Sequence, residues 1–198
     1  MLDAAFMSRW MSATAAAVGR EESRLTDLDS AIGDADHGAN LRRGFTAVTA
    51  VLDKESPDTP GAVLALAGRQ LISTVGGASG PLYGTLLRRT GKALGDAAEV
   101  TREQLARALG DGVAAVAQLG GAAAGDKTML DALLPAVDAL GESFAAAAKA
   151  ADAGALATVP LRARKGRASY LGERSVGHQD PGATSAALLV GALAQAAA

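Results

Sequence analysis

A short acidic segment near the N-terminus carries the side chains best suited to chemistry in this sequence. It supplies three carboxylates and one imidazole, from Asp29, Asp34, Asp36 and His37. Carboxylates this close repel one another, so a cation should offset their charge. Hard oxygen donors in a chain without cysteine favour Mg²⁺ or Ca²⁺, although the ligand spacing of an EF-hand is absent. The alternative is an acidic turn whose aspartates cap the following helix.

The same segment leads directly into a predicted helix that starts near Ala39. Gly33 and Gly38 flank the last two aspartates and the histidine. The first N–H groups of a helix have no partner within it, so they suit an anion. A divalent cation beside a helix N-terminus predicts a polyphosphate ligand.

Two further glycine-rich segments also precede predicted helices. The segment GGASGPLYG at residues 76–84 has small residues that let backbone N–H groups approach a ligand closely, and the alternative is a plain turn between helices. The segment GGAAAGDKTML spans residues 120–130, where Asp126 is expected to cap the next helix. No Walker A pattern occurs, and no G-x-G-x-x-G fingerprint follows a strand. A nucleotide would therefore not be held by a P-loop or a Rossmann fold.

The fourth segment, ARKGRASYLGERSVGHQDPGATS at residues 163–185, combines His178 and Asp180 with four cations: Arg164, Lys165, Arg167 and Arg174. Arginine suits bidentate contacts with phosphate, so the basic end of this segment is a candidate phosphate contact. The alternative is a solvated basic loop. Spacing alone supports no Ser/His/Asp triad, so no catalytic residue is assigned.

The elements that must position these segments are predicted to be helices. Alanine and leucine fill the apolar positions and isoleucine occurs only twice, which favours helices over a parallel sheet. Apolar spacing predicts helices near residues 3–18, 21–28, 41–52, 63–71, 82–94, 101–116, 126–140 and 183–198. Thr101 and Gln104 predict a capping box. We therefore expect one all-α domain over residues 1–198, with glycine-rich loops at helix ends.

Charge and composition exclude several classes of protein. Nineteen Lys and Arg against 21 Asp and Glu give a net charge of −2, which provides no general attraction to nucleic acid or to an anionic membrane. No apolar run reaches the length of a membrane span, and the first residues do not form a secretory signal. A cytoplasmic protein is the expectation.

Four motifs, in order along nearly the whole chain, carry a family resemblance: LDSAIGDADHGANLRRGF, GGASGPLYGT, GDKTMLDALLP and ARKGRASYLGERSVGHQDPGATS. They resemble the L subunits of dihydroxyacetone kinases, the nucleotide-binding half of those enzymes. The resemblance implies an eight-helix antiparallel barrel with ADP or ATP at one end. It implies two Mg²⁺ ions on Asp29, Asp34 and Asp36. It places nucleotide contacts on His37, Gly38, Ala39, Asn40, Ala78, Ser79, Gly120, Met129, Arg167, Asp180, Pro181 and Gly182.

The resemblance also implies partners. The family has an ATP-using form with K and L parts fused, and a form with separate subunits that draws phosphate from the phosphoenolpyruvate phosphotransferase system. The sequence GDADHG, in place of the GDGDCG of the ATP form, is similar to the second. Bound ADP would then accept phosphate from a phosphohistidine M subunit and pass it to dihydroxyacetone on the K subunit. Such L subunits can also contact a transcription regulator.

Two alternatives stay open at this stage. One is the nucleotide domain of an ATP-dependent triose kinase or fatty-acid-type kinase, and the other is a regulatory module that reports nucleotide state. One departure from the family also stands out. The stretch from Phe144 to Leu161 is shorter than is usual in the family, so we expect the penultimate helix to be short or disordered, which leaves the helix count open.

Overall fold

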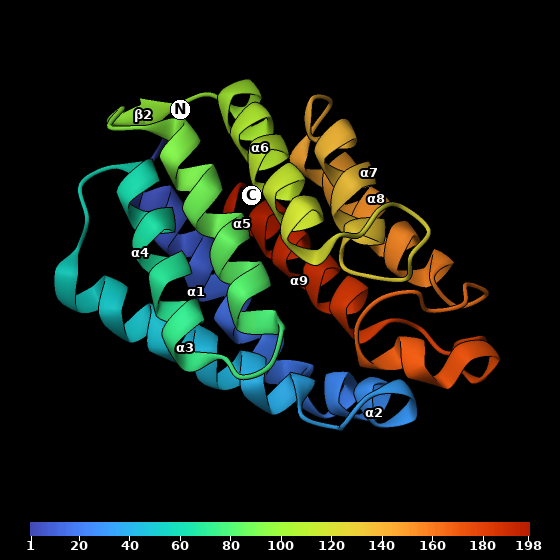
Figure 1. Cartoon of the computed structure of the whole chain (residues 1–198). Helices are drawn as coiled ribbons and strands as arrows, with labels where there is room; N and C mark the ends of the chain where they lie inside the picture. Colours follow the sequence, from blue (N-terminus) through green and yellow to red (C-terminus); the bar gives the residue numbers. More distant parts are fainter.

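The computed structural model describes all 198 residues, and nearly all of its regular structure is helical (Figure 1). Short connections join nine α-helices: α1 (Ala4–Arg20), α2 (Glu22–Ile32), α3 (His37–Glu55), α4 (Pro60–Thr74), α5 (Ser79–Leu94), α6 (Arg102–Gly120), α7 (Leu130–Leu140), α8 (Phe144–Ala157) and α9 (Pro181–Ala196). A 3-10 helix, η1 (Arg167–Ser175), lies in the long connection between α8 and α9. No helix is long and apolar enough to cross a membrane.

Eight of these helices form a closed ring. Each packs against the next in the order α1, α3, α4, α5, α6, α7, α8, α9, and α9 packs in turn on α1. Neighbours in the ring run in opposite directions (Figure 1). The remaining helix, α2, lies at one end of the ring and contacts α3, α9 and η1. The predicted eight-helix antiparallel barrel is therefore confirmed, with α2 as an additional end piece.

Leucine and alanine fill the interior of the barrel, as the composition predicts. The main core contains 41 buried residues drawn from every helix of the ring. The indole N–H of the fully buried Trp10 donates to the carbonyl oxygen of Leu189 at 2.9 Å, which ties α1 to α9 and closes the ring. Burying this much apolar surface is the main force that holds the helices together.

The α8 helix corrects one expectation from the sequence. Its fourteen residues form a regular helix, which Ser143 caps by accepting a hydrogen bond from the N–H of Ala146 at 2.9 Å. Its buried positions are all alanine, and a Cβ on Gly154 would lie only 2.1 Å from the carbonyl oxygen of Asp131 in α7. The expectation of disorder was wrong because these small residues allow close packing between neighbouring helices.

The α4 and α5 helices are also in close contact, through four glycines. Glycines recur seven residues apart on both helices, as Gly61 and Gly68 on α4 and Gly84 and Gly91 on α5. A Cβ on any of the four would lie 2.3 to 2.7 Å from a carbonyl oxygen of the facing helix or of the turn that follows α5. The two backbones therefore touch with no layer of side chains between them, which only glycine permits.

The two ends of the barrel differ in how their helices begin. At one end, side chains cap every helix that starts there: Asp3 for α1, Thr59 for α4, Thr101 for α6 and Ser143 for α8. The predicted capping box of Thr101 and Gln104 is confirmed. A two-residue antiparallel ribbon, β1 (Leu2–Asp3) with β2 (Glu99–Val100), also lies there, too short to show as alternation in the sequence.

At the opposite end, α3, α5 and α7 begin without a hydrogen bond from their own N-cap side chain. The predicted cap of α7 by Asp126 was wrong. Asp126 instead accepts a hydrogen bond from Ala123 within its own loop, and Asp131 accepts from Gly125 and Thr128. At this end, only the first N–H groups of α5 have no side-chain acceptor, since Asp29 accepts from His37 at the start of α3 and Thr128 accepts from Leu130 at the start of α7.

Candidate functional site

The four glycine-rich segments converge on one cavity at the end of the barrel where α3, α5, α7 and α9 begin. They form the connections that lead into α3, α5, α7 and α9, and an antiparallel ring places these four connections at the same end. The cavity has a volume of about 530 Å³. Its lining includes these predicted site residues: Asp29, Asp34, Asp36, His37, Ala78, Ser79, Gly120, Met129, Arg167, Asp180, Pro181 and Gly182.

Three other predicted contacts lie outside this lining, on the first turn of α3. Gly38 packs against α2, where a Cβ would lie 2.2 Å from the carbonyl oxygen of Glu22. Asn40 is buried, and its Oδ1 accepts a hydrogen bond from Nη2 of Arg43 at 2.7 Å. Ala39 is exposed. Gly38 thus allows the close packing of α3 on α2, and nucleotide contact by Gly38, Ala39 and Asn40 stays a prediction.

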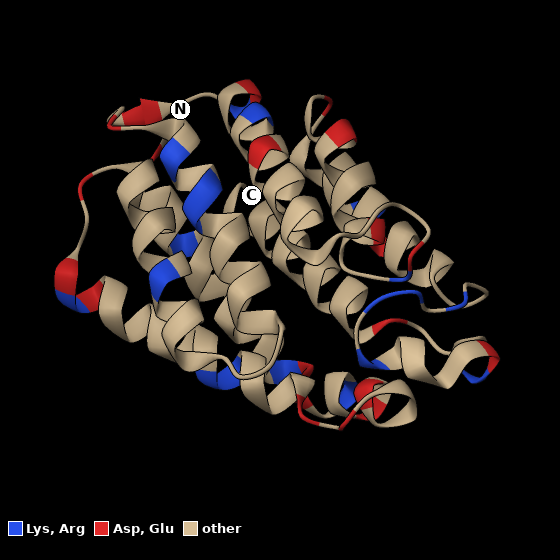
Figure 2. Ribbon diagram, viewed as in Figure 1, with Lys and Arg blue, Asp and Glu red and all other residues tan.

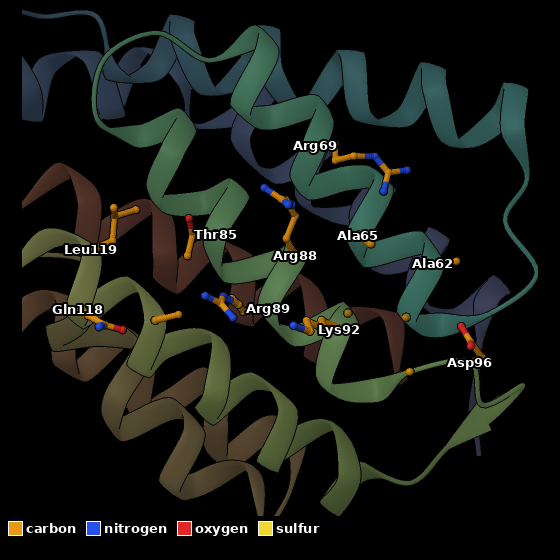
Figure 3. A pocket seen from close by; sticks show the side chains of 14 residues that line it. Ala62, Ala65, Arg69, Thr85, Arg88, Arg89, Lys92, Asp96, Gln118 and Leu119 are labelled. Atoms are coloured by element: carbon orange, nitrogen blue, oxygen red, sulfur yellow. The ribbon is translucent and has the colours of Figure 1, made fainter.

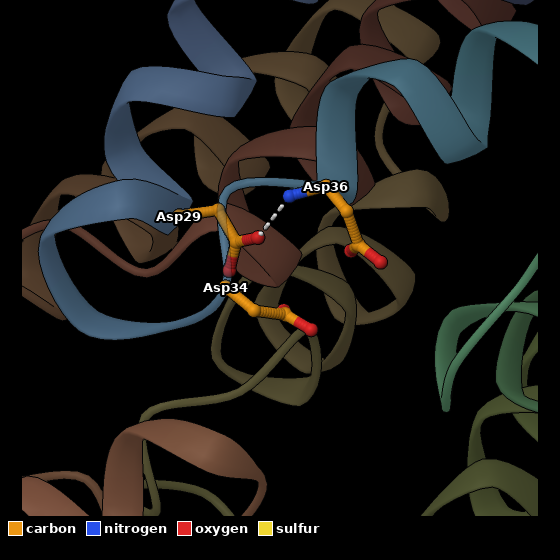
Figure 4. Close-up of side chains that lie close together, drawn as sticks. All are labelled: Asp29, Asp34 and Asp36. Atoms are coloured by element: carbon orange, nitrogen blue, oxygen red, sulfur yellow. Dashed lines mark hydrogen bonds between the residues drawn. The ribbon is translucent and has the colours of Figure 1, made fainter.

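The three aspartates form a compact carboxylate cluster (Figure 4). One carboxylate oxygen from each of Asp29, Asp34 and Asp36 lies within 4.8 Å of the others. Oδ2 of Asp29 accepts hydrogen bonds from the N–H groups of Asp36 at 2.9 Å and His37 at 3.2 Å. Asp29, at the end of α2, therefore caps α3 and brings the last turn of α2 to the first turn of α3.

The chemistry of this cluster fits a divalent cation. Within the chain, only Arg167 forms an ion pair with it, through Nη2 at 3.0 Å from Oδ2 of Asp34. Oδ1 of Asp29 makes no hydrogen bond and faces Gly33, where a Cβ would lie 2.0 Å away. Three clustered carboxylates with one exposed countercharge are the oxygen-donor set that Mg²⁺ prefers. Because Gly33 has no side chain, the Oδ1 atom of Asp29 remains free to act as a metal ligand.

His37 is buried and connects three helices. Its Nε2 lies 2.8 Å from Oγ of Ser185 on α9, and its Nδ1 lies 3.2 Å from Oγ of Ser79 on α5. Ser185 also bonds the phenol oxygen of Tyr83 at 2.6 Å. Burial lowers the pKa of His37, opposed by the nearby charges of Asp29 and Asp36. The imidazole therefore acts as a neutral link, with both ring nitrogens already engaged.

The cavity collects the N-termini of four helices. The first residues of α3, α5, α7 and α9 all line it: His37, Ser79, Leu130 and Pro181. Each helix start carries a partial positive charge, and the first N–H groups of α5 have no side-chain acceptor, so together the four helix starts favour an anion. Asp180 caps α9 through the N–H of Ala183 at 2.7 Å, and its burial raises the pKa of the carboxyl to about 7. The buried cap therefore adds less negative charge near neutral pH than an exposed carboxylate would.

Lys127 is a functional candidate that the sequence reasoning missed. It is 1% exposed, with a backbone φ of 62°. Its ammonium group lies 2.5 to 3.0 Å from four carbonyl oxygens, those of Thr158, Leu161, Ser175 and His178. These carbonyls belong to the connection that carries Arg167 and Asp180 to the cavity. A lysine between glycine-rich and apolar residues was the available signal, because such a lysine has few routes to solvent.

Known proteins share both this fold and this arrangement of motifs. The family profile described as "DAK2 domain" matches residues 31–195. The chain is 43% identical to the PEP-dependent dihydroxyacetone kinase, ADP-binding subunit DhaL, of Escherichia coli, over 95% of this chain and 94% of that protein. It is 34% identical to the PTS-dependent counterpart of Lactococcus lactis, over 91% of each chain.

A solved structure agrees with these relatives. The crystal structure of the dihydroxyacetone kinase from C. freundii in complex with AMP-PNP and Mg²⁺ matches with a TM-score of 0.77 and 29% identity. That match covers 96% of this chain and 34% of the kinase chain, so the fold corresponds to about a third of that enzyme. On the match over most of its length and on these full-length relatives, the chain belongs to the DAK2 domain family.

Proposed function

We propose that this chain is the ADP-binding subunit of a phosphoenolpyruvate-dependent dihydroxyacetone kinase, working as one nucleotide-binding domain over residues 1–198. The observation that carries the proposal is the full-length likeness to such subunits, at 43% identity over 95% of the chain. The carboxylate cluster and the converging helix starts support it, since they complement a metal-bound polyphosphate. The chain is thus a kinase subunit whose reaction needs other subunits.

Asp29, Asp34 and Asp36 would hold the magnesium, which we propose to be two ions. When bound, magnesium supplies charge neutralisation and ADP supplies the carrier for the phosphoryl group. The residues of the chain do the positioning. At the starts of α5 and α9, the backbone N–H groups of Ser79 and Gly182 are available to phosphate, and Arg167 adds a positive charge beside the metal ligands. Such positioning accounts for most of the catalysis in phosphoryl transfer.

Neither histidine of the chain is placed to hold a carbonyl substrate in the cavity. Both nitrogens of His37 are engaged by serine hydroxyls. The only other histidine, His178, is exposed in the connection before α9. We therefore propose that dihydroxyacetone is held by a K-type subunit and that phosphate arrives from the phosphohistidine of an M-type subunit.

The purified chain alone should not phosphorylate dihydroxyacetone. A chain that binds the nucleotide but does not hold the acceptor gives little rate enhancement, because the two reacting groups are not held together. The assay measures triose phosphate formation from Mg-ATP and dihydroxyacetone, first without and then with K-type and M-type subunits, phosphoenolpyruvate and the general phosphotransferase proteins. Product should form only in the complete mixture. Robust turnover by the chain alone would refute the split-subunit proposal and favour a self-sufficient kinase.

Mg-ADP should strongly stabilise the chain against unfolding. A ligand that binds only the folded state, at 1,000 times its dissociation constant, adds about 4 kcal/mol. For a chain of this size that corresponds to a rise in melting temperature of about 8 to 16 °C. The measurement is a thermal melt of nucleotide-free protein with and without Mg-ADP. An unchanged melting temperature would mean that the four glycine-rich segments do not form the nucleotide site.

A further inference from the structure

A larger cavity, of about 960 Å³, lies on the outer surface of the barrel between α4, α5 and α6 (Figure 3). We call it the basic groove. Small residues make up part of its lining: Gly61, Ala62, Ala65, Gly91 and Ala115. Four long cationic side chains stand around them: Arg69, Arg88, Arg89 and Lys92. All four are exposed, and none forms an ion pair within the chain.

Charge is segregated onto this face of the molecule. The segment from residue 60 to residue 94, which contains α4 and α5, carries these four cations and no Asp or Glu. Figure 2 shows Lys and Arg alone along both helices. The chain as a whole has a net charge of −2, so this concentration of positive charge does not reflect a generally basic protein. Only Asp96, in the turn after α5, adds an acidic group to the lining.

We propose that the basic groove is the docking surface for an acidic, amphipathic helix of a partner subunit. Arg88 and Arg89 stand three to four residues before Lys92, which is one helical turn, about 5.4 Å. Acidic residues one turn apart on a partner helix would match this spacing, and complementary charges steer such an encounter. The small residues between the cations leave room for the apolar side of that helix.

The same surface is poorly suited to other anions. A single-stranded nucleic acid would need aromatic side chains on which bases stack, and none lines the groove. A small phosphate would need donors ordered around one point, whereas these cations come from two helices and project freely into solvent. A protein helix uses the whole length of the surface.

The position of the basic groove relates it to the nucleotide site, so this inference rests on the proposed function for the identity of the partner. Leu119, at the end of α6, lines both the groove and the cavity at the barrel end. Its side chain is 54% exposed. A helix seated along α5 would therefore hold its subunit beside the opening to the phosphates, where a donor or an acceptor must be placed.

The test is the charge-reversal variant Arg89→Glu/Lys92→Glu. Neither side chain forms an ion pair within the chain or lines the nucleotide cavity, so folding and Mg-ADP affinity should be unchanged. Binding of purified K-type and M-type subunits from the same organism is measured by calorimetry at low and moderate salt. We expect at least a tenfold loss of affinity for one of the two subunits, together with a weaker dependence of that affinity on salt.

The matched control is Arg107→Glu/Lys149→Glu, which makes the same change in net charge at exposed positions on α6 and α8 outside the groove. The inference is overturned if the groove variant binds both subunits like the wild type, if the control loses as much affinity, or if the wild type binds neither subunit. Loss of binding to a DNA duplex, with subunit binding intact, would also overturn it. The Mg-ADP titration reports separately on the nucleotide site.

Discussion

Replacing Asp34 or Asp36 by asparagine should weaken binding of Mg-ADP by about a hundredfold or more. Each substitution removes one of three carboxylates that lie within 4.8 Å of one another. A charge interaction at 4 Å is worth about 4 kcal/mol at an effective dielectric constant of 20, and about 1.4 kcal/mol corresponds to a tenfold change in affinity. Calorimetric titration of Mg-ADP into each variant measures the loss.

Two controls locate this effect at the metal. Asp27→Asn removes an exposed carboxylate from α2 outside the cluster and should leave Mg-ADP affinity unchanged. In the presence of EDTA, both cluster variants should bind ADP at least as tightly as the wild type, because carboxylates without a cation repel the phosphates. Wild-type affinity for Mg-ADP in both cluster variants would contradict the assignment of the metal ligands.

Lys127→Met should destabilise the fold and disrupt the cavity together. Methionine has similar length but cannot donate to the four carbonyl oxygens that surround the ammonium group. Leaving buried carbonyls without a donor costs about 1 to 3 kcal/mol each, so a total near 3 kcal/mol is a conservative expectation. That lowers the melting temperature by about 6 to 12 °C. Amide exchange should speed up most between residues 158 and 180.

The same substitution should weaken Mg-ADP binding at temperatures where the variant is fully folded, because the loosened connection carries Arg167 and Asp180. Lys54→Met is the matched control, since it removes an exposed lysine of α3 that lies outside the cavity lining and makes none of these carbonyl contacts. Methylammonium should partly restore a Lys127→Ala variant by occupying the same ring of oxygens. If Lys127→Met leaves amide hydrogen exchange between residues 158 and 180 unchanged, Lys127 does not organise that connection.

Local patterns were enough to predict the helices and the acidic cluster. Apolar spacing located every helix of the ring except α8, whose regularity was in doubt, because burial of one face imposes that spacing. The cluster of Asp29, Asp34 and Asp36 was predictable because its members are close in sequence. Contacts between distant segments were not predictable in this way. Capping of the following helix by the aspartates was named only as the alternative to a metal site, and Asp29 does cap α3. Nothing near His37 in the sequence indicates its link to Ser185.

Lys127 also shows that contacts between distant segments cannot be predicted from local patterns. The glycine-rich and apolar residues around Lys127 are a signal for its burial, but its acceptors are four carbonyl oxygens from residues 158 to 178, which no local pattern identifies. The prediction that Asp126 caps α7 was wrong for a related reason. Asp126 has the residue type and the position of a helix cap, but Asp131, inside the first turn, accepts the loop N–H groups instead. Propensity identifies candidates for such roles, and tertiary contact selects among them.

The direct backbone contact of α4 with α5 has mechanical significance for the barrel. Carbonyl oxygens of one helix face the glycine Cα atoms of the other, so the pair has no slack to slide or rotate. If the barrel opens during ligand exchange, its helices must then separate at interfaces that contain side chains, while α4 and α5 move together as one rigid pair. Within this pair, α5 begins with Ser79 at the cavity and carries Arg89 and Lys92 on its outer face. A partner that binds the basic groove and shifts α5 would therefore also shift Ser79 at the opening of the cavity.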